Sequence, residues 1–376
     1  MAEPDLSTLT QLVLGAAFVV GIVFGAVSQR TQFCTMGALA DIVAMGDWTR
    51  LRMWALAVAV AVLGFNAMAA VGWIDADDTL YGRPQLQWLS NALGGALFGV
   101  GMVLASGCSS KNLVRIGGGS LKAVVVFCVL GLSAYATLRG VIAVARVASV
   151  DTVRTTLPTS QDLPSLLAHA TGLARRHTIV LLGGGVGLAL LAWVLARPEG
   201  RARETWLGGV GIGACVVAVW WISGRLGHLA EHPATLEEGF LATNSRGLES
   251  LNFVAPIAYT LDWLILYSDA SQRLTIGIVA VVGVIVGSWA VALAGGRFRW
   301  EGFAGVEDTA LHLVGAALMG VGGVTALGCT VGQGLSGLST LSIGSVIAVA
   351  GIIGGALAAL HWQQWRLMRG ASQEGA

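Results

Sequence analysis

Three cysteines stand at positions where the sequence can support chemistry. Cys34 follows the polar run Gln-Arg-Thr-Gln-Phe, and Cys108 and Cys329 each follow a glycine and precede a polar, glycine-rich stretch. A thiol is a weak hydrogen-bond donor with a soft sulfur, so it can meet a soft anion without holding it as tightly as an arginine would. A pathway needs contacts of that strength, because its substrate must both enter and leave. The three thiols therefore predict a pathway for a small sulfur-containing anion.

The other two cysteines carry no such prediction. Cys128 and Cys215 lie inside ordinary apolar segments, where cysteine behaves as a small hydrophobic residue. Five cysteines without a Cys-x-x-Cys pair are not typical of a disulfide framework. We therefore expect substitution of Cys128 or Cys215 to be nearly silent.

The pairs Gly107-Cys108 and Gly328-Cys329 each end an apolar segment, and we call these two points the glycine–cysteine breaks. Polar side chains near the breaks are candidate partners for an anion. Arg30, Lys111 and Arg115 are the cations near the first break, and their field would draw an anion to its mouth; alternatively, they only extend to the lipid headgroups. Asn112 and Gln333 each lie four residues after a break cysteine, and their amides can donate hydrogen bonds to an oxyanion. Helix N-termini opening after each break would add backbone N–H groups and a favourable dipole.

The segments that carry two of the cysteines are copies of each other. Residues 94–108 read GGALFGVGMVLASGC and residues 315–329 read GAALMGVGGVTALGC, so ten of fifteen positions are identical at a constant offset of 221. A shorter alignment at an offset of 220 matches Phe33 with Phe253 and places Val254 opposite Cys34. An odd number of crossings between two such copies inverts the second one. Inverted repeats of this kind are the architecture of many secondary transporters, whose substrate site lies at the repeat interface.

The composition requires a membrane around these segments. Of the 376 residues 55% are hydrophobic and only 11% are charged, whereas roughly a quarter of a soluble domain is charged. We expect an all-α polytopic membrane protein with about nine transmembrane helices and two short re-entrant helices, one after Cys34 and one in 251–261. Its two inverted four-helix halves are joined by one extra helix. The predicted crossings are 11–28, 53–74, 88–107, 122–142, 178–196, 205–223, 274–295, 310–327 and 342–361.

The predicted crossings divide the chain into three parts. Residues 1–146 form the first half, 147–205 a linker with an interfacial helix at 163–176 and one transmembrane helix, and 206–376 the second, inverted half. Lysines and arginines gather in loops that fall on one side, which the positive-inside rule assigns to the cytoplasm. We therefore expect a periplasmic N-terminus and a cytoplasmic C-terminus.

Other classes of function find little support. The net charge of +1 indicates no general affinity for nucleic acid. The run His228-Leu-Ala-Glu-His232 matches a zinc-peptidase pattern, but Pro233 ends any helix directly after it. Asp41 and Asp262, at matching places in the two short segments, are candidate proton-coupling sites, although a role as capping or polar helix-end residues is the favoured alternative. We expect membrane lipid as surroundings, no cofactor, no metal, and a transporter rather than an enzyme.

The motifs around the cysteines resemble those of the YeeE/YedE family of bacterial sulfur-compound transporters. The similarity rests on the runs QRTQFCTMGALAD, ASGCSSKN, GVGGVTALGCTVGQGLSG and LNFVAPIAYTLDW, and it is weakest over 143–205. The resemblance implies uptake of thiosulfate across the bacterial inner membrane, with Cys34, Cys108 and Cys329 passing the anion along by S–H···S hydrogen bonds. It also implies a small TusA-like cytoplasmic sulfur-carrier protein as a partner.

Alternatives stay open at this point. After Cys108 the chain reads Ser-Ser-Lys-Asn where the family has a Thr-Ser-Gly-like run, so sulfite, sulfide and other reduced sulfur anions are also candidate substrates. A first rival function is a membrane sulfur relay that forms a cysteine persulfide, with Lys111 lowering the pKa of the Cys108 thiol. A second rival is a scaffold subunit for a cytoplasmic sulfur carrier, without transport of its own.

Overall fold

Long apolar helices build the molecule, as the composition predicts. The computed structural model describes residues 6–231, 236–269 and 271–374, and within these ranges nine helical segments are long and apolar enough to cross a membrane. The protein is therefore an all-α, multi-pass membrane protein, and the nine predicted crossings are confirmed. They are built on α1 (Leu6–Thr31), α3 (Thr49–Ala70), α4 (Trp88–Leu104), α6 (Leu121–Leu138), α9 (Arg175–Leu195), α10 (Arg203–Trp221), α12 (Ile276–Ala294), α13 (Val306–Thr325) and α14 (Ile343–Glu374).

Short elements join these helices. They comprise α2 (Thr35–Met45), α5 (Ser109–Gly117), α7 (Val141–Ala148), α8 (Leu163–Thr171), α11 (Ala255–Ile265), the 3-10 turns η1 (Val150–Thr152) and η2 (Pro198–Arg201), and the π-helical turns η3 (Ile222–Leu226) and η4 (Gly332–Gly337). The strands β1 (Gln85–Leu86) and β2 (Thr155–Thr156), and β3 (His228–Leu229) and β4 (Gly239–Phe240), form two antiparallel pairs in loops.

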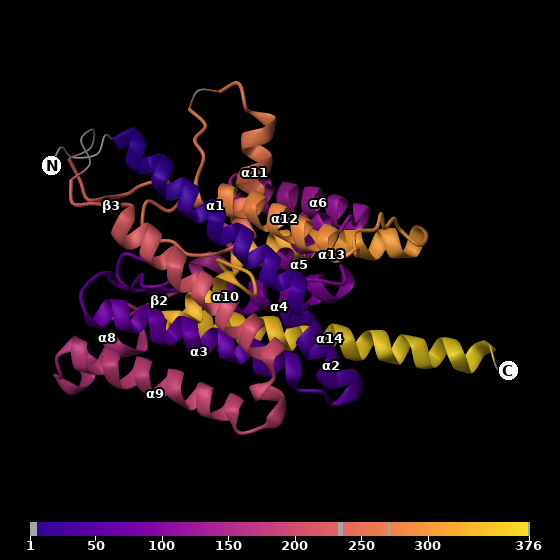
Figure 1. The fold of residues 1–376 in the computed structure, drawn as a ribbon, viewed down its shortest axis with the longest axis horizontal. Helices are drawn as coiled ribbons and strands as arrows, with labels where there is room; N and C mark the ends of the chain where they lie inside the picture. Colours follow the sequence, from indigo (N-terminus) through magenta and orange to yellow (C-terminus); the bar gives the residue numbers. More distant parts are fainter. Residues whose placement is uncertain (1–5, 232–235, 270, 375–376) are drawn as a thin grey trace.

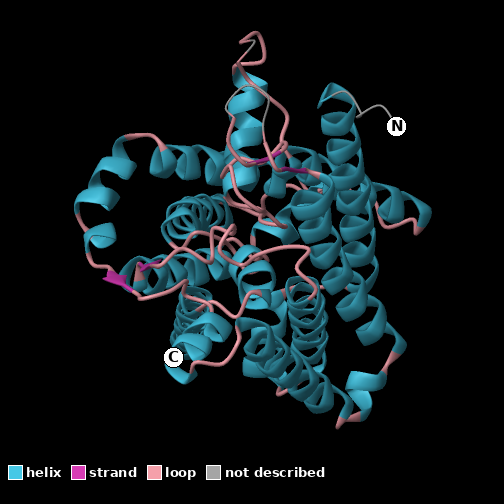
Figure 2. Ribbon diagram, turned by 90° about the vertical axis from the view of Figure 1, so that its left-hand side faces the viewer, coloured by secondary structure: helices cyan, strands magenta, loops and turns pink. Residues whose placement is uncertain are grey.

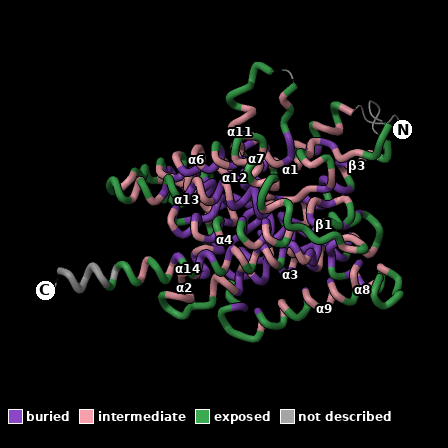
Figure 3. Tube along the Cα trace, turned by 180° about the vertical axis from the view of Figure 1, so that it is seen from behind, coloured by how far each residue is buried: buried purple, intermediate pink, exposed green. Residues whose placement is uncertain are grey.

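The bundle helices run roughly along one direction, which gives the molecule two opposite faces (Figure 1). The N-terminal face carries the start of α1, helix α8 and the β3–β4 pair, and the C-terminal face carries the end of α14 and the α12–α13 loop. Figure 2 looks onto the N-terminal face, where several bundle helices are seen end-on. Buried residues gather at the centre of the bundle, and α9 and the end of α14 lie at its edge (Figure 3).

Helices at equivalent positions in the two halves make equivalent contacts. Helix α1 packs against α12 and α10 packs against α3, while α4 packs against α14 and α13 packs against α6. The central contacts are α1 with α10 and α4 with α13. Exchanging the members of each pair α1/α10, α3/α12, α4/α13 and α6/α14 reproduces the same contacts, as an inverted repeat requires. Helix α9 packs on α3 outside this arrangement; the division of the chain at 146 and 205 stays a prediction.

Glycine makes the closest of these contacts possible. A Cβ atom at Gly25 would lie 2.1 Å from the carbonyl oxygen of Val284 on α12, and one at Gly99 would lie 2.2 Å from that of Ile352 on α14. Both distances are too short for any other residue. Gly25 and Gly99 therefore let backbones approach closely across the interfaces of α1 with α12 and of α4 with α14.

The two predicted short helices are present and are equivalent in their packing. Helices α2 and α11 have 11 residues each, about 16 Å at 1.5 Å per residue, and cannot cross a hydrocarbon core of about 30 Å. Helix α2 packs on α3 and α14, and α11 packs on the equivalent helices α12 and α6. The predicted interfacial helix 163–176 is shorter than expected, since α8 ends at Thr171, where Gly172 takes the left-handed conformation of a helix C-cap.

Candidate functional site

The three pathway cysteines are buried, and each begins a turn of helix. Cys34 is the N-cap of α2 and its sulfur accepts a hydrogen bond from the backbone N–H of Gly37 at 3.3 Å. Cys108 is the N-cap of α5, and Cys329 accepts a hydrogen bond from the N–H of Gly332 at 3.4 Å. Helix N-termini carry partial positive charge and free N–H groups. The three sulfur atoms therefore lie where an anion is favoured.

The thiols lie close together and are joined by hydroxyl groups. Cys34 and Cys108 lie close enough for each thiol to act on the other. The Thr330 hydroxyl contacts the Cys108 thiol, and the Ser109 hydroxyl contacts the Cys329 thiol. Because Ser109 and Thr330 are the residues that directly follow Cys108 and Cys329, each break cysteine meets the hydroxyl residue of the other break. We call these five residues the thiol–hydroxyl cluster.

Sequence reasoning missed both hydroxyl residues, although a signal was present. Ser109 and Thr330 are buried, and neither hydroxyl oxygen has a nitrogen or oxygen partner among the described residues. A buried polar group without such a partner costs about 1–3 kcal/mol, and groups of this kind call for a functional explanation. Their equivalent positions, one residue after each break cysteine, would have identified them in the repeat alignment.

The N–H groups of the two predicted amides donate hydrogen bonds to backbone carbonyl groups at the breaks. The Asn112 amide nitrogen donates to the carbonyl oxygens of Gly107 and Cys108, at 2.9 and 3.1 Å. The Gln333 amide nitrogen donates to the carbonyl of Ala326. These donors thus bind backbone carbonyl groups in the turns that follow α4 and α13. Both N–H groups of Asn112 are used in this way and one of Gln333, and the role of the two amides toward an oxyanion stays a prediction.

The predicted cations separate into one that reaches the cluster and one that does not. Lys111 lies close enough to Cys34 and Cys108 for its charge to act on both thiols, and its ammonium donates to the Gln32 side chain at 2.8 Å. Arg30 lies at the exposed end of α1, with 58% of its side chain accessible, and its guanidinium is 3.8 Å from the Glu204 carboxylate. Arg30 therefore stays outside the site, because the last turn of α1 directs it away from the break.

A cavity of about 620 Å³ opens beside the cluster on the C-terminal face. Lys111 and Ser106 belong to its lining, so it reaches the residues that flank Cys108. Three further cations face it against a single carboxylate, which makes this cavity basic. Its lining residues are Gln29, Gln32, Ser106, Lys111, Arg115, Gly118, Ser120, Arg297, Arg299, Trp300 and Glu301.

A second cavity, of about 250 Å³, opens on the N-terminal face beside Cys329. Its lining includes Leu327, two residues before Cys329, and Tyr81, which lies close to the Cys329 thiol. Arg83 and Glu249 are the charged residues of this lining. The second cavity is therefore smaller and less basic than the first.

The two cavities follow the repeat. Gln29, Gln32 and Ser106 line the first cavity, and their equivalents Glu249, Asn252 and Leu327 line the second. Ser106 and Leu327 both adopt left-handed backbone conformations, with φ of 53° and 60°. Such residues carry strain of roughly 1–2 kcal/mol outside glycine and cluster at functional sites. The equivalent strain one residue before each Gly-Cys pair indicates that both breaks are built to the same plan.

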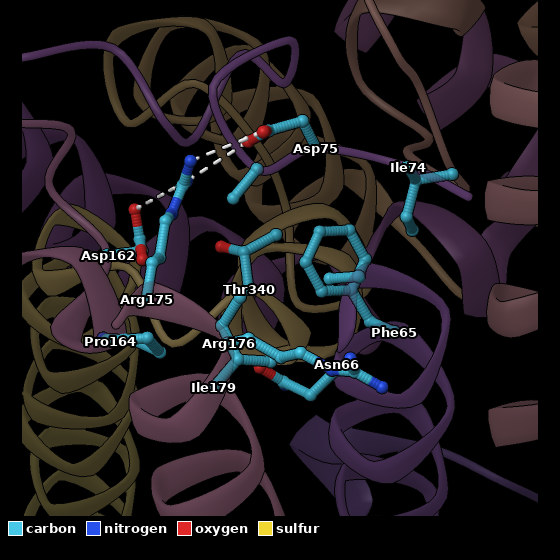
Figure 4. Close-up of a pocket in the computed structure, with 12 residues that line it drawn as sticks. Phe65, Asn66, Ile74, Asp75, Asp162, Pro164, Arg175, Arg176, Ile179 and Thr340 are labelled. Carbon is cyan, nitrogen blue, oxygen red and sulfur yellow. Dashed lines mark hydrogen bonds and ion pairs between the residues drawn. The ribbon is translucent and has the colours of Figure 1, made fainter. Parts of the chain in front are cut away.

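A third cavity, of about 170 Å³, is separate from the cysteines (Figure 4). One of its charged residues, Arg175, turns from the start of α9 to Asp75 and Asp162 and also binds Asp77. The guanidinium is thus shared among carboxylates and ties the linker helix to two loops. No predicted pathway residue lines this cavity.

The acids of the two short helices and the first histidine of the run at 228–232 make contacts away from the cysteines. Asp41 pairs with Arg50 at 3.1 Å, and Asp262 accepts a long hydrogen bond of 3.4 Å from Gln272. His228 binds the Glu238 carboxylate at 2.7 Å, and His232 lies outside the described residues. Within the described ranges no three His, Cys, Asp or Glu side chains gather as metal ligands do.

Comparison with known proteins gives a consistent result over nearly the whole chain. The family profile described as "Sulphur transport" matches residues 30–358. The chain is 25% identical to the thiosulfate transporter TsuA of Spirochaeta thermophila over 338 residues, which cover 88% of this chain and 93% of that protein. It is 24% identical to the thiosulfate transporter TsuA of Escherichia coli over 346 residues, covering 90% and 92%. A shorter match, 30% over 112 residues, covers 29% of this chain and 26% of the probable transporter YedE of Escherichia coli.

Proposed function

The chain belongs to the sulphur transport family, and from this premise we propose that it carries thiosulfate across the bacterial inner membrane. The observation that carries the proposal is the thiol–hydroxyl cluster, which lies between a cavity on each face. Thiosulfate has a soft terminal sulfur and harder oxygen atoms. A cluster of thiols and hydroxyls offers a donor for each kind of atom.

The substrate follows the repeat from one face to the other. It enters the cavity on the N-terminal face, where Arg83 has no ion-pair partner among the described residues and attracts an anion. It then meets Cys329 with Ser109, and next Thr330 with Cys108 and Cys34. Each donor is weak or neutral, so no single station holds the anion so tightly that it stops moving.

Lys111 and the amides have supporting roles in this pathway. The ammonium of Lys111 faces Cys34 and Cys108 from the side of the basic cavity and draws the anion past them. Asn112 and Gln333 act as positioning residues, because their donors hold the carbonyl groups beside each break. Arg30 contributes only to the charge of the C-terminal face.

The charge of the two faces supports an orientation. Arg115, Arg297 and Arg299 line the mouth on the C-terminal face, and positive residues in short loops favour the cytoplasm. We place the C-terminus there and the N-terminus in the periplasm, so that transport through the cluster is inward. The same basic mouth is suited to a small TusA-like sulfur carrier that receives the anion. Pull-down of such a carrier, lost in Arg297→Glu with Arg299→Glu, would support this docking.

One observation favours a second function, a sulfur relay. Lys111 lies near two thiols that are neighbours, and a cation stabilises a thiolate. In a relay the Cys108 thiolate attacks the outer sulfur of thiosulfate, forming a cysteine persulfide and releasing sulfite. Mass spectrometry of protein incubated with thiosulfate would then show one added sulfur. Transport without this adduct separates the carrier from the relay.

The direct test is uptake of radiolabelled thiosulfate by the purified protein in proteoliposomes, with sulfate and sulfite as competitors. We expect saturable uptake in the parent protein and in Cys215→Ala, and its loss in Cys329→Ala. The control residue Cys215 is buried in α10, so both variants remove a buried thiol. Well-inserted protein that takes up no sulfur anion would contradict transport and point to a scaffold that needs a partner.

A further inference from the structure

The cavity on the N-terminal face has an acid at a position where its repeat-equivalent cavity has a neutral amide. Glu249 lines the second cavity, and the equivalent residue Gln29 lines the first. Resting on the proposed function, we propose that Glu249 is a proton-binding site whose occupancy admits the anion, so that a proton and the substrate enter together. The proposed gate lies on the N-terminal face, because Glu301, the carboxylate of the first cavity, is already paired with Arg115 and Lys122.

The position of Glu249 suits this role. Its carboxylate accepts a hydrogen bond from the backbone N–H of Ser245, and its own carbonyl oxygen accepts one from the Ser223 hydroxyl. The side chain is half-buried and forms no ion pair within the part of the chain that the structure describes. A carboxylate without a cation beside it is free to change its protonation state as the cavity fills.

The groups that surround Glu249 are few and mostly neutral. Tyr81 of the α3–α4 loop lies close to both Glu249 and Cys329, and so connects the acid to the thiol–hydroxyl cluster. Tyr259 on α11 lines the same cavity and lies close enough to Glu249 to feel its charge. The charged groups nearby are Arg83, which also lines the cavity, and Arg139 and Asp262, whose charges act on Tyr259. None of these cations forms an ion pair with Glu249 among the described residues.

Electrostatics links the proton to the substrate. An ionised Glu249 repels a dianion that enters its small cavity, and protonation removes this repulsion. Linkage is reciprocal, so the bound dianion raises the proton affinity of Glu249 by the same factor as the proton raises affinity for the dianion. Burial raises the pKa of the Glu249 carboxyl above its ordinary value, against the hydrogen bonds that lower it. The protonated form therefore persists to a higher pH than it would for an exposed glutamate.

Another acid on the same face provides a matched control. Burial, with the charges of Asp75, Glu238 and Asp77, raises the pKa of Asp78 to about 6, and His228 opposes the shift. Asp78 is therefore a second acid on this face whose pKa lies above its ordinary value. Asp78 does not line the cavity, because its contact with this region is a backbone bond to Leu248. If the pH effect comes from the charge of the whole face, substitution of Asp78 should change it. If it comes from a gate in the pathway, only substitution of Glu249 should change it.

The experiment measures labelled thiosulfate uptake into proteoliposomes whose interior is held at one pH while the exterior is varied between about pH 5 and about pH 8. A pH-sensitive dye trapped inside reports protons that enter. In the parent protein we expect uptake to rise about tenfold across this range as the exterior becomes acidic. Glu249→Gln, neutral at every pH, should keep uptake and lose its dependence on exterior pH, without internal acidification. Asp78→Asn should keep the full dependence.

The outcomes separate this inference from the function on which it rests. Absence of uptake by the well-inserted parent protein at every pH overturns the transport function itself. Uptake by the parent protein that does not vary with exterior pH, or a Glu249→Gln profile that matches the parent profile, overturns the proton site alone. If Asp78→Asn loses the dependence of uptake on exterior pH while Glu249→Gln keeps it, the proton site is Asp78, and the assignment to Glu249 is overturned. If Glu249→Gln is poorly inserted, Glu249→Asp should shift the profile to lower pH and keep uptake.

Discussion

The two glycine–cysteine breaks follow one plan and differ in what surrounds them. Both have a left-handed residue before the glycine, a buried cysteine, and a hydroxyl residue that reaches the opposite thiol. At the first break the Cys34 thiol lies beside Cys108, and helix α5 continues for nine residues. At the second, Val254 takes the place of Cys34, and Cys329 is followed by the π-helical turn η4. The contact between each hydroxyl and the thiol of the opposite break is thus common to both breaks, whereas the additional thiol, Cys34, is found at the first break alone.

The same comparison applies to charge. Lys111 lies three residues after Cys108, while Gly332 lies three residues after Cys329. The cavity at the first break carries four cations, the neutral Gln29 and one carboxylate, whereas the cavity at the second carries Arg83 and Glu249. In the proposed pathway the two mouths thus present different potentials to the same anion. Such a difference would give the proposed pathway a direction, which a perfectly symmetric pathway would lack.

The largest expected effect tests which contributes more to uptake, the contacts between each break cysteine and the opposite hydroxyl or the additional thiol of Cys34. Cys108→Ala and Cys329→Ala each remove a thiol that contacts the opposite hydroxyl, and we expect thiosulfate uptake to fall about 100-fold in each. Cys34→Ala leaves both crossed contacts in place, so we expect a fall of about tenfold. Initial rates in proteoliposomes, normalised to inserted protein, provide the measurement.

Cys128→Ala is the control for the loss of a thiol from an apolar helix, and it should keep the parent rate. An equal loss in Cys34→Ala and Cys329→Ala would show that the paired thiols at the first break are as necessary as the crossing. Cys34 would then be an essential station, and the two breaks would differ less in function than in structure.

The charge at the first break has the next largest effect. Lys111→Gln removes the cation closest to Cys34 and Cys108, so we expect KM for thiosulfate to rise about tenfold with a smaller change in kcat. Added salt should weaken uptake by the parent protein more than uptake by the variant, because the field of Lys111 is screened. Arg30→Gln, in the exposed pair with Glu204, is the control and should leave KM unchanged. A similar KM for both variants would place Lys111 among the general surface charges.

Much of the fold could be predicted because the repeat and the apolar spans leave few alternatives. The segments 94–108 and 315–329 located both breaks and paired Cys108 with Cys329. The uncharged stretches located nine spans to within a few residues, and the largest miss is α14, which continues to Glu374. Periodicity cannot mark that end, because the last turns are polar but still helical.

The cluster itself was only partly predictable. Sequence spacing along one half cannot show that Ser109 reaches the thiol of the other half, since that contact depends on how α5 and η4 face each other. The contacts of Asn112 could not be predicted for a related reason, because its amide binds backbone carbonyl groups whose positions depend on how the chain turns after α4. The pairing of Arg30 with Glu204 could not be predicted either, because nearness in sequence to Cys34 says nothing about the direction of its side chain.

A substitution at Gln29 tests whether the proton gate is all that distinguishes the two mouths. Gln29→Glu places in the basic cavity the acid that Glu249 provides on the other face. We expect uptake to fall about threefold when the pH on the C-terminal face is raised, because the ionised side chain repels the departing anion. Uptake by the parent protein should not vary with pH on that face. A Gln29→Glu variant that ignores this pH would show that the cations of the basic cavity cancel the added charge.

The smallest expected effect concerns the strain that the two breaks share. Ser106→Gly should stabilise the protein by about 1 kcal/mol, because glycine adopts its φ of 53° without the steric cost that serine bears. In detergent, that gain should raise the melting temperature by about 2–4 °C. Ser106→Ala keeps the Cβ atom and should give no gain. Leu327→Gly, at the equivalent position with φ of 60°, also loses the leucine side chain from its cavity and should gain less. Equal gains would mean that backbone strain dominates at both breaks, so that they differ only in the side chains that line them.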